Sequence, residues 1–144
     1  MAVTLEIFID RLGNLENYLK KKVSEVVMEH QDKIVDLSTA QLMEGKNIED
    51  KLMQTGYSTQ YEKRRQKTGL QTKFVDLRFS GKYQDTKKLY KTREGFDIKS
   101  DADYEKYLRG NFPGHVGLTE KNSKVISDDL VNEIAILTKK YLTA

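Results

Sequence analysis

The sequence contains no cysteine, no tryptophan and one proline in 144 residues. Without cysteine, neither a disulfide nor a thiolate metal site is possible. No apolar run approaches the roughly 18 residues of a membrane-spanning helix. The start, Met-Ala-Val-Thr-Leu-Glu, also lacks the basic residues and apolar run of a signal peptide. We therefore expect a soluble protein that is made in the cytoplasm and has no membrane contact.

Residues suited to catalysis are scarce, and there are only two histidines. His30 falls on an apolar helical stripe, which is typical of a structural residue. His115 lies in the glycine-rich loop GNFPGHVG and is the better candidate, but no Ser-centred motif or cysteine is available to pair with it. The sequence therefore predicts no catalytic residue, and we expect the protein not to be an enzyme.

A metal site is not expected either. Asp101, Asp103 and Glu105 alternate like a fragment of a calcium loop, but the glycine and the terminal glutamate of an EF-hand loop are missing at the right offsets. Helix capping and a favourable interaction with the helix dipole explain these acidic residues better. We expect no metal and no cofactor.

The run Ser80-Gly81-Lys82 resembles the end of a phosphate-binding loop. Such a loop needs a glycine five residues before its Gly-Lys pair and a Ser or Thr directly after it. Asp76 and Tyr83 occupy those two positions. The run instead predicts a strand that ends at Gly81 and passes into a helical turn.

The net charge of +3 is spread unevenly along the chain. Residues 61–94 carry 11 basic and 4 acidic side chains, a net charge of +7, whereas the segments before and after carry −3 and −1. Such a cationic segment can contact nucleic acid or an acidic protein surface, and it can also be ordinary solvated surface.

Apolar residues at helical spacing predict a long helix over about residues 4–43. Thr4 is a plausible N-cap, Gly13 is a place where the helix can kink or split, and Gly45 is a natural stop. A helix of this length is long for so small a protein. We expect it to extend beyond the core or to pack against a neighbouring subunit.

The rest of the chain predicts shorter elements. A short helix begins at Ser58 or Thr59 and ends at Gly69, and a C-terminal helix begins at Thr119 or Ser123. Between them we expect strands at 74–79, 89–90 and 96–98 and a helix at 101–109. The predicted class is α+β, in one domain of residues 1–144: a long helix at about 4–43, a basic loop and small antiparallel sheet with short helical inserts at about 46–100, and a short helix and C-terminal helix at about 101–142.

Residues 38–122 carry a recognisable pattern, AQLMEGKN, YSTQYEKRRQKTG, VDLRFSGKYQDT and DADYEKYLRGNFPGHVGLTEKN. This pattern resembles the virion-morphogenesis and tail-completion (neck) proteins of tailed bacteriophages, most of all those from phages of Bacteroides-like hosts. The resemblance rests on a first helix ending near a glycine, a Tyr-Ser-x-x-Tyr stretch, a turn from Leu77 to Tyr83 and a Gly-Leu-Thr start to the last helix. Ser80 replaces the usual Thr of that turn, and Tyr83 the usual Phe or Leu.

The resemblance implies a structural virion protein with no active site, located in the tail or neck. Such a protein forms a homo-oligomeric ring in the head–tail connector and contacts portal or adaptor proteins and tail proteins, with genomic DNA passing through the channel as a further possible contact. As interface residues we predict two valines of the long helix and five basic residues: Val26, Val27, Lys63, Arg64, Arg65, Lys73 and Arg78. Three glycines are predicted at structural turns, namely Gly45, Gly81 and Gly117. The alternative is a nucleic-acid-binding module that uses the basic segment 61–94.

Overall fold

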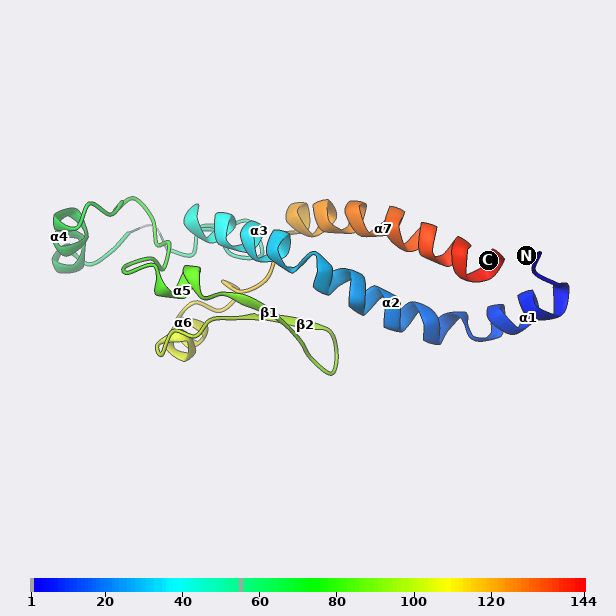
Figure 1. The fold of residues 1–144 in the computed structure, drawn as a ribbon. Coiled ribbons are helices and arrows are strands. Elements are labelled where there is room, and N and C mark those ends of the chain that lie inside the picture. The colour runs from blue at the N-terminus through cyan, green and yellow to red at the C-terminus, as the bar shows by residue number, and fades with distance from the viewer. Residues whose placement is uncertain (1, 55) are drawn as a thin grey trace. The chain divides into compact units, whose positions relative to one another are not determined.

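The computed structural model describes residues 2–54 and 56–144. Within them the chain forms seven helices and one two-stranded antiparallel sheet (Figure 1). The helices are α1 (Leu5–Gly13), α2 (Leu15–Glu29), α3 (Gln31–Met43), α4 (Thr59–Lys67), α5 (Lys82–Asp85), α6 (Glu105–Asn111) and α7 (Glu120–Thr143), and the strands are β1 (Lys88–Lys91) and β2 (Phe96–Lys99). The predicted α+β class is confirmed. None of the described helices combines the length and apolar character needed to cross a membrane.

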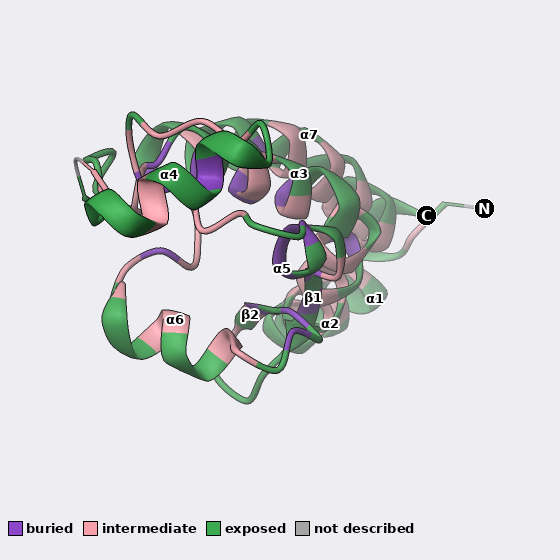
Figure 2. Cartoon of the chain, turned by 90° about the vertical axis from the view of Figure 1, so that its left-hand side faces the viewer, coloured by how far each residue is buried: buried purple, intermediate pink, exposed green. Residues whose placement is uncertain are grey.

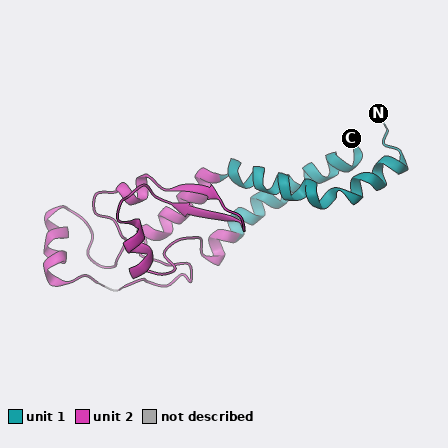
Figure 3. Ribbon diagram, turned by 90° about the horizontal axis from the view of Figure 1, so that it is seen from below, with its two compact units in different colours: residues 1–30, 124–144 teal, residues 31–123 magenta. Residues whose placement is uncertain are grey.

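The chain divides into two compact units (Figure 3). Unit 1 comprises residues 1–30 and 124–144, and unit 2 comprises residues 31–123. The sequence predicted one domain over residues 1–144, without this division.

The prediction of one continuous helix over 4–43 is wrong, because the segment forms α1, α2 and α3. Thr4 caps α1 as expected, since its Oγ1 accepts a hydrogen bond from Ile7 N at 3.3 Å. The first break follows Gly13, the residue that the sequence marked as a possible split. The second break, at His30, was not foreseen. Nδ1 of His30 donates to the Val26 carbonyl at 2.9 Å, and this local bond accompanies a backbone that has left helical geometry.

Unit 1 pairs α1 and α2 with the C-terminal part of α7. Tyr18 stacks on Tyr141 with ring centroids 3.9 Å apart, and Arg11 Nη1 donates to the Tyr141 carbonyl at 3.0 Å. Among the described residues of this unit only Val26 and Ile126 are buried, so its apolar core is small.

Unit 2 is built around a core of Leu42, Tyr83 and Ala102, with Met53, Leu77, Tyr104 and Leu108 packed against it. Buried segments lie on α3, α5 and the hairpin, whereas most of the outer surface of α6 is exposed (Figure 2). The two predicted strands at 89–90 and 96–98 are confirmed as β1 and β2, which pair antiparallel with Leu89 opposite Ile98. These two side chains are buried and place the hairpin on the core.

The predicted strand at 74–79 is wrong, since this segment has no strand assignment and no sheet partner. Its polar groups bond elsewhere: Val75 N donates to the Gln54 carbonyl at 3.2 Å, and Asp76 N donates to Tyr57 Oη at 3.2 Å. Leu77 also has a φ of 57°, which is incompatible with a strand. Segment 74–79 is therefore an irregular connection, and its alternating apolar residues do not mark a strand.

The last two helices lie close to their predicted positions. The short helix α6 starts at Glu105, four residues later than expected, because Ser100 and Ala102 form a side-chain-stabilised turn before it. Thr119 caps α7 through a bond from Asn122 N to its Oγ1 at 3.2 Å, which matches the predicted start. Gln41 of α3 accepts a further bond from Thr119 N at 2.9 Å.

The three glycines predicted at turns, Gly45, Gly81 and Gly117, have φ values of 75°, 88° and 111°. At Gly45 a Cβ atom would lie 2.5 Å from a ring carbon of Phe74, so both the backbone conformation and the space exclude a side chain. Gly81 begins the four-residue helix α5, and this helix is too short to offer a phosphate-binding N-terminus.

Candidate functional site

His115, the better catalytic candidate of the sequence, is held in a structural pair. Its side chain is buried, and Tyr83 Oη lies 2.6 Å from its Nε2. Nδ1 donates to the Phe112 carbonyl at 2.8 Å. Burial lowers the pKa of His115, so the ring is neutral and its Nε2 accepts a hydrogen bond from the Tyr83 hydroxyl. Both ring nitrogens are occupied: the bond at Nε2 connects the loop after α6 to α5, and the bond at Nδ1 lies within that loop.

Ser38 and Lys87 form the one described contact that resembles a nucleophile–base pair. Lys87 Nζ donates to Ser38 Oγ at 2.9 Å, and burial lowers the pKa of Lys87 to about 8. Ser38, however, is 1% exposed, and the groove of about 500 Å³ beside Lys87 is not lined by Ser38. A substrate therefore has no route to the hydroxyl, and the bond satisfies a buried ammonium group.

No group of three or more His, Cys, Asp or Glu side chains within residues 2–54 and 56–144 is placed to hold a metal ion. Glu105 of the calcium-like fragment accepts bonds from Ser100 N at 3.2 Å and from Arg109 Nη2 at 3.2 Å. Glu105 lies in the first turn of α6, where the helix dipole favours a carboxylate, but these bonds do not cap the helix.

The basic residues predicted at an interface differ in their exposure to solvent. Lys63, Arg64 and Lys73 are exposed, and Arg78 is half-buried. Arg65 is 1% exposed, so its placement among exposed interface charges is wrong. Its position on α4 turns the side chain into unit 2, where Asp76 accepts from Nη2 at 3.0 Å.

The bonds around Arg65 and Asp76 organise the loop that follows α4. Arg65 Nε donates to the Gln71 carbonyl at 2.9 Å, and Nη1 donates to the Arg78 carbonyl. Asp76 also accepts from Gln71 Nε2 at 2.9 Å and from Arg78 N at 2.9 Å. The two charged side chains are therefore structural. Their hydrogen bonds fix the path of segment 71–78, which has no sheet partner.

The two valines predicted at an interface also differ in their exposure to solvent. Val26 is 2% exposed and belongs to the core of unit 1, so its side chain cannot be a contact surface for another molecule while that unit is folded. Val27 is half-buried. Val26 and Val27 lie in unit 1 and the five basic residues in unit 2.

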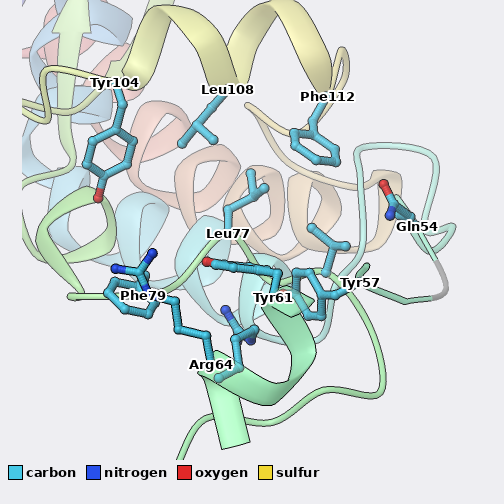
Figure 4. A pocket seen from close by; sticks show the side chains of 11 residues that line it. Gln54, Tyr57, Tyr61, Arg64, Leu77, Phe79, Tyr104, Leu108 and Phe112 are labelled. Carbon is cyan, nitrogen blue, oxygen red and sulfur yellow. The ribbon is translucent and has the colours of Figure 1, made fainter. Parts of the chain in front are cut away.

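Unit 2 contains a cleft of about 490 Å³ that the sequence analysis did not foresee (Figure 4). We call it the aromatic cleft and define it by its eleven lining residues: Gln54, Tyr57, Tyr61, Arg64, Arg65, Val75, Leu77, Phe79, Tyr104, Leu108 and Phe112. Tyr104, Leu108 and Phe112 point from α6 toward Leu77 and the tyrosines on the opposite side. The spacing of Tyr57 and Tyr61, and of Tyr104, Leu108 and Phe112, was the signal available in the sequence.

Cations already cover part of the aromatic cleft. The Arg64 guanidinium lies 4.9 Å from the centre of the Phe79 ring, and that of Arg65 lies 4.5 Å from the centre of the Tyr57 ring. Phe79 is nevertheless 40% exposed. The cleft thus combines an apolar floor with a cationic, partly exposed rim at Arg64.

Unit 1 carries an exposed apolar surface on α1, which has no buried residue. Leu5, Ile9 and Leu12, which we call the α1 stripe, recur at helical spacing and are 74%, 59% and 46% exposed. An amphipathic helix normally buries such a stripe against another element. The α1 stripe is therefore a candidate contact surface.

Comparisons of the chain with protein-family models, with curated proteins and with solved structures gave no match.

Proposed function

We propose that the chain is a structural virion protein that forms a ring in the head–tail connector of a tailed bacteriophage and joins portal-side and tail-side components. The observation that carries the proposal is the exposed α1 stripe, because a subunit that works by assembly needs an apolar surface that its own fold leaves uncovered. The proposal places the protein in the virion neck and assigns it no cofactor and no catalytic activity.

The resemblance over residues 38–122 supports the same role. Its turn from Leu77 to Tyr83 includes two core residues, since Tyr83 is 2% exposed and Leu77 packs against it. Gly81 in that turn has a positive φ, as a tight turn of this kind requires. The residues of this turn on which the resemblance rests thus shape the fold of unit 2.

A nucleic-acid-binding module is the second candidate, and the exposed cations Lys63, Arg64 and Lys73 favour it. Two of the basic side chains in segment 61–94, Arg65 and Lys87, are buried and unavailable to phosphates. Phosphate contacts make affinity fall by roughly 0.9 log unit per log unit of salt for each phosphate neutralised. Tight, salt-sensitive binding of duplex DNA by the full chain would replace the assembly proposal with this one.

The assembly proposal is tested by electron microscopy of the purified full chain. The expected result is closed rings for the wild type and none for Leu5→Asp combined with Ile9→Asp. The matched control is Ile136→Asp, because Ile136 is 69% exposed on α7 of the same unit but lies outside the α1 stripe. Rings in the double variant equal to those of the wild type would contradict the role given to the α1 stripe.

A further inference from the structure

We propose that α1 of one copy docks in the aromatic cleft of the next copy. This inference rests on the proposed function and specifies its subunit contact. The α1 stripe and the aromatic cleft are each incomplete in a single chain: the first is an apolar helix face without a cover, and the second is an apolar hollow without an occupant among the described residues. The occupant that we assign to the cleft is α1 of a second copy of this chain.

The two surfaces match in chemistry. Leu5 and Leu12 are seven residues apart, so the α1 stripe spans about 10 Å at 1.5 Å per residue. The cleft has a volume of about 490 Å³ and is lined by aromatic and aliphatic side chains on most of its surface. An apolar helix face laid into an apolar groove is an established mode of recognition.

The charges around the two surfaces are opposite. Glu6 and Asp10 lie one turn apart on α1 and flank the α1 stripe on one side. Arg64 lies on the rim of the cleft, with Lys63 next to it in α4. Among the described residues, none of these four side chains makes an ion pair. Docking would bring the acidic border against the basic rim, which would fix the orientation of α1 in the cleft.

Base stacking suits the cleft less well. Single-stranded nucleic acid binds by stacking bases on free aromatic faces. Arg64 covers one face of Phe79, and Arg65 covers one face of Tyr57 and also approaches Tyr61, with 5.9 Å to its ring centre. These rings present fewer free faces to a base, while their edges remain suited to aliphatic side chains.

The proposed contact is heterologous, because the donor surface on unit 1 differs from the acceptor surface on unit 2. A heterologous contact leaves the pair with one unused donor on one copy and one unused acceptor on the other, and further copies then close a ring when the rotation between them closes. This is the contact geometry that a neck ring requires, whereas pairing of two α1 stripes would stop at a dimer.

The absence of cysteine allows a direct test by disulfide trapping in the full chain. One preparation carries Ile9→Cys and the other carries Phe79→Cys, and both positions are exposed. The two are mixed under mild oxidation, and the disulfide-linked heterodimer is measured by non-reducing intact mass spectrometry, which separates it from the two homodimers. The matched control replaces Ile9→Cys with Ile136→Cys, since Ile136 is exposed to a similar extent in the same unit. Proximity in the docked pair predicts at least about tenfold more heterodimer than in the control.

The other outcomes separate the two proposals. If the wild type self-associates in sedimentation but the test and control mixtures cross-link equally, docking in the cleft is wrong and assembly stands. If Ile9→Cys links mainly to itself, pairing of α1 with α1 replaces the docking proposal. If the wild type stays monomeric at every concentration and no mixture cross-links, self-assembly itself fails. Binding of an oligo-dT strand that is lost in Phe79→Glu would assign the cleft to nucleic acid and also overturn the inference.

Discussion

Arg65 and Asp76 form an ion pair inside unit 2, with 3.0 Å between Nη2 and Oδ1 and side chains that are 1% and 2% exposed. Both partners make further hydrogen bonds within segment 71–78, so the pair organises a loop that contains two of the predicted interface residues, Lys73 and Arg78. A buried pair of this kind is costly to break, because the charge left behind has no water to replace its partner.

Arg65→Met is therefore expected to destabilise the protein by about 3–5 kcal/mol. The matched control is Arg64→Met on the neighbouring, exposed position of α4, which is expected to change stability by less than about 1 kcal/mol. Urea denaturation followed by circular dichroism measures both. Equal stabilities of the two variants would show that the ion pair does not hold the loop.

Lys87 gives a pH dependence of stability that can be measured. Burial lowers its folded-state pKa to about 8 from an ordinary value of 10.5. Between these values the unfolded chain binds more protons than the folded chain, so the free energy of unfolding rises with pH. The expected gain from pH 7 to pH 9.5 is about 2 kcal/mol.

The measurement ends at pH 9.5 because burial raises the pKa of Tyr83, and that group lowers stability once the unfolded tyrosine ionises near pH 10. Lys87→Met is expected to remove the rise, whereas Lys88→Met, at the adjacent exposed position, should keep it. A rise that persists in Lys87→Met would assign it to another group.

Gly45 and Gly69 form a matched pair of glycines with φ values of 75° and 73°. A Cβ at Gly45 would collide with Phe74, whereas a Cβ at Gly69 would have no atom within 4 Å. Gly69→Ala should cost about 1–2 kcal/mol for its left-handed backbone alone. Gly45→Ala should cost more, by the additional strain of the collision. Thermal unfolding of both variants checks the order, and a larger loss for Gly69→Ala would contradict the packing described at Gly45.

Local signals in the sequence identified several elements of the fold. Thr4 and Thr119 cap helices through bonds that involve only neighbouring residues, and the β-forming residues on either side of the turn at 92–95 predicted the hairpin. The irregular path of 74–79 depends on bonds to Gln54, Tyr57 and Arg65, which are distant in sequence. A pattern of alternating residues cannot reveal such partners.

The candidate site was harder to predict for the same reason. The residue type alone does not show whether an arginine is exposed or buried. Arg64 and Arg65 were therefore both predicted at an interface, although only Arg64 lies at the surface. The aromatic cleft joins residues from the segment before α4, from α4, from the loop that follows it, and from α6 and its two flanking residues, and only the folded chain brings them together. The helical spacing of the apolar residues in α1 was visible in the sequence. The sequence did not show that no other element of the chain buries them.

Native mass spectrometry of the full-length wild-type chain tests the central claim, self-assembly, most directly. We expect one discrete assembly whose mass is an integer multiple of the 16.7 kDa subunit, and its loss in Leu5→Asp combined with Ile9→Asp. The control Ile136→Asp should retain it. A wild-type chain that remains monomeric across the accessible concentration range would contradict the account.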